Sequence, residues 1–136
     1  MGKRRAPNLR DEYTHQRAVF NFIDITSIRH PEFKMIVGSL NGIWLEGENK
    51  YAVIRKLQKA GCFPVGYPDI HWPMYRNPYS GLYIELKRDR HSRVSAEQRG
   101  WQRWLTKQRF FATISCSENE TKDILMRYFE GEMRAK

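Results

Sequence analysis

The sequence predicts a mixed α/β domain, in which a central sheet is flanked by helices. Segments with apolar residues at helical spacing alternate with short runs rich in aromatic and β-branched residues. Two capping boxes, which begin at Ser95 and Ser117, mark helix starts. At 136 residues and 40% hydrophobic composition, the chain is long enough to bury one core. We expect a single domain over residues 11–130, between a basic tail at 1–10 and a short tail at 131–136.

The first half of the chain is expected to contain two helices and one short strand. Apolar residues along one broad face predict a helix over 9–24. The run FKMIV predicts a strand over 33–37, and Asn41 with Gly42 predicts a turn. Apolar residues at helical spacing predict a second helix over 49–60.

The second half predicts three strands and two helices. Strands over 69–72 and 82–87 are expected to be neighbours, joined by a long hairpin loop. Capping boxes predict one helix over 95–108 and another that follows Ser117. Between these helices, the aromatic and β-branched run over 110–116 predicts a further strand.

The charge of the chain points toward an anionic partner. The 24 Lys and Arg residues against 15 Asp and Glu give a formal charge of +9, and 15 of the cations are arginines. Arginine makes bidentate contacts with phosphate, which favours nucleic acid, although a ribosome-associated or membrane-surface protein would share this charge. No segment approaches the ~20 apolar residues of a spanning helix, so a membrane protein is not expected. The two cysteines form no CxxC pair that would suggest a zinc site.

Paired Glu-x-Lys sequences are the first candidate for a functional motif. The spacing occurs four times, as Glu32 with Lys34, Glu48 with Lys50, Glu85 with Lys87, and Glu120 with Lys122. Three of the four lie at helix starts, in polar loops or on a strand without an acidic neighbour. Only Glu85 and Lys87 combine a central apolar strand with a carboxylate on the preceding strand.

The alternation of strand residues places these two charges together. It sends Glu85 and Lys87 to one face of their strand and Ile84 and Leu86 to the other. Asp69, on the preceding strand, has room within the hairpin to approach Glu85. An ordinary surface pair of Glu85 and Lys87 on an edge strand is the alternative from spacing alone.

Two converging carboxylates require a positive partner. With ordinary pKa values of ~3.9 and ~4.3, Asp69 and Glu85 would both be ionised at neutral pH and would repel each other. A hard cation between them removes the repulsion, and oxygen ligands suit Mg²⁺ or Mn²⁺ better than Zn²⁺.

These residues carry a resemblance to a known family. Pro68-Asp69 followed by Glu85-Leu86-Lys87 is similar to the PD-(D/E)xK nuclease motif. The longer pattern GYPDIHWP, YSGLYIELKR, SAEQRGWQRWL and ATIS before a last helix resembles the VRR-NUC branch, the virus-type replication-repair nucleases. The resemblance extends from about residue 11 to residue 129. It implies a restriction-endonuclease-like core with a central mixed sheet flanked by helices.

The resemblance also implies roles for particular residues. Asp69 and Glu85 would bind Mg²⁺ or Mn²⁺, with the Leu86 backbone carbonyl and waters completing the shell. Lys87 would orient or deprotonate the attacking water, or stabilise charge on the phosphorus. Glu12 matches the family's acid in the first helix, which supports the metal site directly or through water.

Gln98 and a basic loop complete the expected site. Gln98 matches a family glutamine that reaches into the site, but its capping box with Ser95 already accounts for it, and we expect the two tasks to be difficult for one side chain to share. Arg88, Arg90 and Arg93 follow the site strand and are placed to hold the DNA backbone, although a charged run is often only a solvated loop.

The activity implied is that of a metal-dependent DNA endonuclease that cuts branched DNA, as a Holliday-junction resolvase does. A homodimer is expected, in the cytoplasm of a bacterial or phage-infected cell, with no organic cofactor and no membrane. The alternatives are a repair nuclease that prefers flaps or other structures, and a non-catalytic basic DNA-binding module. Trp101 and Trp104 are expected in core or dimer packing rather than in base stacking.

Overall fold

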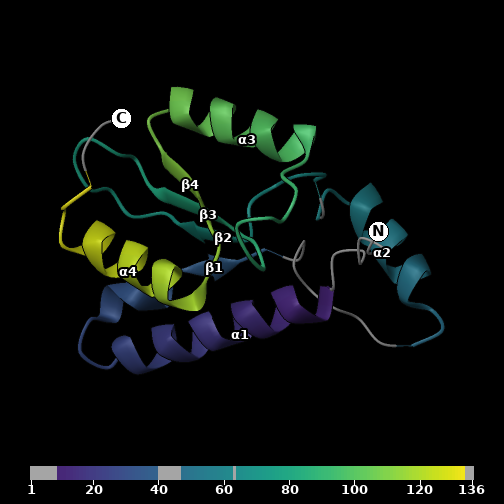
Figure 1. The fold of residues 1–136 in the computed structure, drawn as a ribbon, viewed down its shortest axis with the longest axis horizontal. Helices are drawn as coiled ribbons and strands as arrows, with labels where there is room; N and C mark the ends of the chain where they lie inside the picture. Colours follow the sequence, from purple (N-terminus) through teal and green to yellow (C-terminus); the bar gives the residue numbers. More distant parts are fainter. Residues whose placement is uncertain (1–8, 40–46, 63, 134–136) are drawn as a thin grey trace.

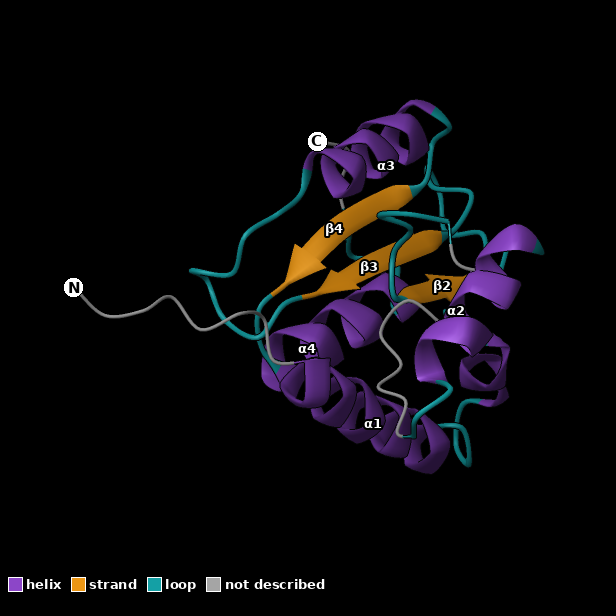
Figure 2. Ribbon diagram, turned by 90° about the vertical axis from the view of Figure 1, so that its right-hand side faces the viewer, coloured by secondary structure: helices purple, strands orange, loops and turns teal. Residues whose placement is uncertain are grey.

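A four-stranded mixed sheet between two helical layers forms the body of the protein (Figure 1). The computed structural model describes residues 9–39, 47–62 and 64–133. The elements, in order, are α1 (Leu9–Thr26), the 3₁₀ turn η1 (Pro31–Met35), β1 (Val37–Gly38), α2 (Lys50–Lys59), β2 (Ile70–Trp72), β3 (Leu82–Leu86), α3 (Ala96–Lys107), β4 (Phe111–Ser115) and α4 (Glu118–Phe129). Helix α3 covers one face of the sheet, and α1 and α4 cover the other (Figure 2). The predicted α/β class is therefore confirmed.

The strand order is β1-β2-β3-β4, with one change of direction. The first three strands pair antiparallel, whereas β3 and β4 run parallel and are joined through α3. The predicted hairpin between β2 and β3 is confirmed, since Ile70 pairs with Ile84 and Trp72 with Leu82. Strand β3 is therefore central, which excludes the edge-strand alternative for Glu85 and Lys87.

Apolar packing differs between the two faces of the sheet. Between the sheet and the layer of α1 and α4 lies the larger core, whose fully buried members include Phe33, Trp72, Leu125 and Tyr128. On the α3 side, Leu105 and Tyr83 form a smaller cluster with Ala112, against which Tyr67, Trp101 and Phe110 pack. The α3 side therefore leaves part of the sheet to polar residues.

The strand predicted over 33–37 is largely wrong. Pro31 begins a 3₁₀ turn, for which its fixed φ is suited, and this turn places Phe33 in the core at 0% exposure. Only two residues, Val37 and Gly38, then pair with β2. The predicted Asn41-Gly42 turn lies outside the described residues.

Helix α2 is present as predicted, but its apolar residues are not buried. None of its side chains is buried, and Tyr51 and Val53 are 63% and 46% exposed. In Figure 1 the helix stands apart from the layers of the main body. Its apolar stripe therefore contributes little to the core.

Both predicted helix starts are confirmed, with one difference in detail. Ser95 forms a full capping box with Gln98. Ser117 accepts a hydrogen bond from the backbone N–H of Glu120, but the Glu120 carboxylate accepts one from Cys116, one residue earlier than a capping box requires. No helix in the described part of the chain has the length and apolar character that crossing a membrane would require.

Candidate active site

Two buried carboxylates meet where β2 begins and β3 ends. Ile70 pairs with Ile84 in the antiparallel register, so the next step along places Asp69 opposite Glu85. Asp69 is only 5% exposed and Glu85 only 4%. The backbone N–H of Leu86 donates a 2.7 Å hydrogen bond to Asp69 Oδ2, which fixes this carboxylate against the end of β3. The structure thus brings together the two predicted acids.

Lys87 carries the positive charge of this cluster. It is 6% exposed, and its Nζ lies 3.8 Å from Glu85 Oε1. Its backbone N–H donates to the Ser115 carbonyl of the neighbouring strand at 2.8 Å, so the main chain below the ammonium is held by the sheet. Burying a lysine beside a carboxylate is costly unless both are hydrogen-bonded, which makes such a cluster a candidate for function rather than stability.

Gln98 connects the charges to helix α3. Its Oε1 accepts hydrogen bonds from Lys87 Nζ and from the Ser95 backbone N–H, both at 2.9 Å. Its Nε2 donates to Glu85 Oε1 at 2.7 Å. The expectation that capping and site contact would be hard to combine is therefore wrong, because an amide oxygen accepts two bonds while its nitrogen still donates.

Comparison with solved structures gives a match for the fold over most of the chain. A protein titled "VRR_NUC domain protein" is similar, with a TM-score of 0.63 and 23% sequence identity over 82% of this chain and 85% of that chain. The chain has the VRR-NUC fold. This confirms the resemblance drawn from the motifs. No family model matches the sequence, and no curated protein does.

The donor set of this VRR-NUC fold suits one kind of metal. No group of three or more His, Cys, Asp and Glu side chains that could hold a metal ion is found within residues 9–39, 47–62 and 64–133. A structural or catalytic zinc site, with three or four protein ligands, does not fit these residues. Mg²⁺ retains several waters and binds through one or two carboxylates, so Asp69 and Glu85 do fit it.

Two further residues are predicted to bind the metal, and the structure gives the place of each in the fold. Glu12 belongs to α1, but its side chain lies outside the described residues. Leu86 ends β3 beside both acids and is 1% exposed. The role of its carbonyl stays a prediction.

The predicted basic loop follows the site strand and leads into α3. Arg88, Arg90 and Arg93 are all exposed. Asp89 shapes the loop, since its carboxylate accepts a 2.8 Å hydrogen bond from the His91 N–H and pairs with Arg88 at 3.2 Å. The hydrogen bond from His91 is the main cause that lowers the pKa of Asp89. Arg90 and Arg93 are thus presented from an ordered turn.

A buried histidine below the site was not predicted from the sequence. His15 of α1 lies 3.3 Å from Thr121 Oγ1, which in turn lies 2.6 Å from Ser115 Oγ. Burial lowers the pKa of His15, while the Glu118 carboxylate and the backbone carbonyls of Ser117 and Lys87 act in the opposite direction.

The spacing of apolar residues along α1 indicates that this histidine lies on the buried face of the helix. His15, Val19 and Ile23 recur every four residues and are all buried. The histidine is part of the inner face of the helix, where it ties α1 and α4 to the end of the sheet.

His71, on β2, has a structural role. It stacks on Tyr83 with ring centroids 4.1 Å apart and an interplanar angle of 6°. Burial lowers its pKa.

Proposed function

We propose that this chain is a Mg²⁺- or Mn²⁺-dependent DNA endonuclease that acts on branched DNA. The observation that carries the proposal is the buried cluster of Asp69, Glu85, Lys87 and Gln98 at the end of the central strand. A protein that only binds DNA has no use for two buried carboxylates, which repel phosphate. Carboxylates that can bind a metal, beside a lysine that can stabilise negative charge, suit metal-assisted phosphodiester hydrolysis.

In the proposed hydrolysis, some site residues would hold the metal cation and others would stabilise negative charge on the phosphate. Asp69 and Glu85 would hold the cation, with the Leu86 carbonyl and Glu12 as further ligands. When bound, the cation lowers the pKa of a coordinated water and offsets negative charge on the scissile phosphate. Because Leu86 N–H fixes Asp69 and Gln98 fixes Glu85, both carboxylates are oriented before the substrate arrives.

Lys87 is better suited to stabilising charge than to taking a proton. In its contacts with the described residues Gln98 and Glu85, it acts as a proton donor or as a cation toward Gln98 Oε1 and Glu85 Oε1. An ammonium has three N–H donors, so it can also reach a phosphate oxygen or the attacking water. This geometry favours stabilisation of the negative charge that develops in the transition state.

The proposal extends to DNA binding beside the site and to a homodimer. Arg88, Arg90 and Arg93 would contact the phosphate backbone beside the cut. Symmetric cleavage of two strands needs two sites related by a two-fold axis, which a homodimer provides. The exposed apolar residues of α2 offer a surface for a second copy.

A substrate panel tests the proposal. Labelled four-way junction, flap and linear duplex DNA would be incubated with the purified protein, in Mg²⁺ or in excess chelator. We expect cleavage in Mg²⁺ alone, fastest on the four-way junction, and light scattering should give the mass of a dimer. Cleavage in chelator, or of none of the substrates in Mg²⁺ and Mn²⁺, would refute the proposed activity.

The panel also distinguishes the alternatives. A preference for flaps would indicate a repair nuclease of different specificity. Binding to DNA without cleavage of any substrate would indicate a non-catalytic DNA-binding module.

A further inference from the structure

Helix α3, whose first turn carries Gln98, also carries an exposed tryptophan. Trp104 is 57% exposed, so the core packing predicted for it is wrong, and the dimer packing stays a prediction. It lines an open groove of about 460 Å³ together with Val65, Glu97, Gly100 and Trp101. More than half of this residue is exposed, so it adds little to the core.

Several contacts hold the two walls of the groove together. Trp101 Nε1 donates a 3.0 Å hydrogen bond to the Val65 carbonyl, and its ring packs edge-on against Tyr67. Gly66 has a φ of +81°, and a Cβ there would lie 2.6 Å from the backbone carbon of Glu97. The loop at Gly66 therefore packs closely against the start of α3, and only glycine permits this approach.

Both walls of the groove continue into the candidate active site. The loop wall at Val65 and Gly66 leads within a few residues to Asp69. The helix wall carries Gln98, which contacts both Lys87 and Glu85. A DNA strand held at Asp69 and Glu85 would therefore lie beside the two elements that form the groove.

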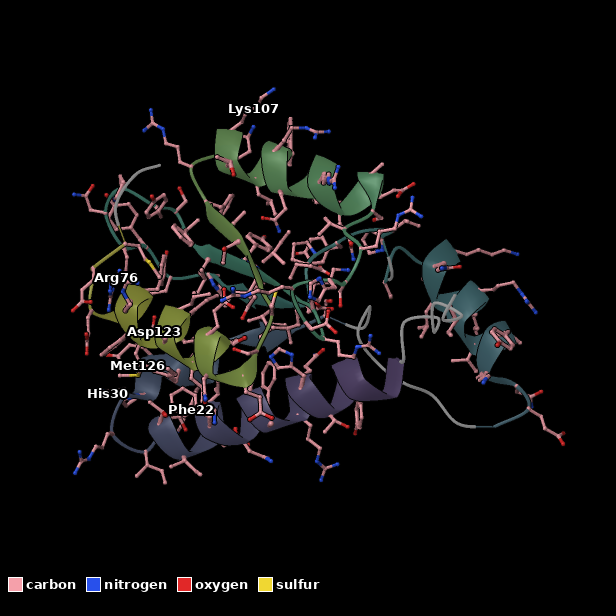
Figure 3. All side chains as sticks on the ribbon, in the orientation of Figure 1. Phe22, His30, Arg76, Lys107, Asp123 and Met126 are labelled. Carbon is pink, nitrogen blue, oxygen red and sulfur yellow. The ribbon has the colours of Figure 1, made fainter. Side chains whose placement is uncertain are left out.

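The charge around the groove is complementary to a nucleic acid. Arg103 adjoins Trp104, Lys107 follows one turn later, and Arg99 lies one turn before Arg103, all of them exposed. Figure 3 shows Lys107 pointing away from the body of the protein. One carboxylate, that of Glu97, stands among the residues that line the groove. Arginine and lysine beside an exposed aromatic ring are the combination that binds single-stranded nucleic acid.

We propose that this groove binds an unpaired base of the DNA substrate, stacked on Trp104, with Arg103 and Lys107 at the adjacent phosphates. The inference rests on the proposed function, since it assigns a base-binding subsite beside the same site. Gly100 leaves space for the base, because a Cβ at this position would meet nothing within 4 Å. The subsite reads the presence of an unstacked base rather than its identity, because every base has a face that can stack.

The test measures binding without cleavage. Fluorescence anisotropy, in excess chelator, would give the affinities for a short labelled oligo(dT) and for a matched abasic strand, which has the same phosphates but no bases. We expect the natural protein to bind oligo(dT) about tenfold more tightly than the abasic strand. Trp104→Ala should abolish this preference, whereas Trp104→Phe should retain most of it.

Two controls show whether the preference comes from the ring of Trp104 within the groove. Tyr75→Ala removes an aromatic ring that is 63% exposed on the β2–β3 loop, and it should leave the preference unchanged. A preference that survives in Trp104→Ala would overturn the inference. So would a dimer that becomes a monomer in Trp104→Ala, because the groove would then belong to a second copy.

The proposed function and the subsite can fail separately. A protein that prefers oligo(dT) through Trp104 yet cuts no DNA in Mg²⁺ refutes the nuclease and keeps the subsite. A protein that cuts DNA but binds both strands equally refutes the subsite alone.

Discussion

The two faces of strand β3 are equally buried but differ in chemistry. Toward α1 and α4, the strand presents Leu82, Ile84 and Leu86, each at most 1% exposed and in contact with apolar residues. Toward α3, Glu85 and the following Lys87 are also almost fully buried, yet they are charged. The first face stabilises the fold by removing apolar surface from water. The charged pair on the second face consumes stability, and its hydrogen bonds keep that cost low enough for the fold to tolerate it.

Among variants that compare the two faces of β3, the largest effect should come from removing the ammonium on the charged face. Lys87→Met keeps most of the side-chain volume but loses the donor, so we expect DNA cleavage to slow by about a hundredfold to a thousandfold. Single-turnover cleavage with saturating enzyme measures it. Ile84→Val, on the other face of the same strand, is the matched control and should cut at nearly the natural rate. Equal rates for the two variants would contradict the division between the faces.

Stability should show the reverse pattern. Ile84→Ala opens a cavity in the larger core and should lower the free energy of unfolding by about 2–5 kcal/mol. Glu85→Gln has the same shape and removes a buried charge, but it also removes the counter-ion of Lys87, so it should lower this free energy by about 1–2 kcal/mol, less than Ile84→Ala. Urea unfolding followed by circular dichroism gives both values. A larger loss for Glu85→Gln than for Ile84→Ala would mean that the charged cluster holds the fold together.

A pair of variants at the start of α3 separates capping from catalysis. Ser95→Ala removes the cap hydrogen bond and should cost about 1 kcal/mol of stability, with cleavage nearly unchanged. Gln98→Ala removes the same box and also the contacts with Lys87 and Glu85, so cleavage should fall by about tenfold or more in addition. If both variants slow cleavage equally, Gln98 acts only through the position of the helix.

The smallest effect concerns pH. Burial lowers the pKa of His15 below its ordinary value of 6.5, so the unfolded chain binds the proton more readily than the folded one. The free energy of unfolding should therefore fall as the pH drops below about 6.5, by at most about 1.4 kcal/mol per pH unit for this single proton. His15→Gln should show a shallower slope in urea unfolding at several pH values. An unchanged slope would show that His15 does not contribute to this dependence.

Local signals in the sequence predicted much of the fold and of the site. The cap at Ser95 depends on residues within one turn, and alternation along β3 depends on neighbours two apart, so both can be inferred without tertiary contacts. The approach of Asp69 to Glu85 can be inferred from the hairpin, because the loop between the two strands is long enough to bring the carboxylates together and alternation separates them from the buried apolar residues.

Features that depend on packing could not be predicted in this way. The run FKMIV has strand composition, but the place of Phe33 in the core and the proline before it select a 3₁₀ turn. Trp101 and Trp104 both lie near the apolar side of α3, yet the loop at Val65 accepts a hydrogen bond from Trp101 and leaves Trp104 exposed. The double task of Gln98 depends on how near the helix start lies to Lys87, which spacing does not give.

Cleavage of a labelled four-way junction by the natural protein and by Asp69→Asn, each in Mg²⁺ and in chelator, tests the metal-dependent nuclease activity most directly. Asparagine keeps an oxygen to accept the Leu86 N–H but lacks the charge that binds a cation. We predict Mg²⁺-dependent cutting by the natural protein, and junction binding without cutting by Asp69→Asn. Equal cutting by the two proteins would contradict the proposed role of this carboxylate and, with it, the proposed activity.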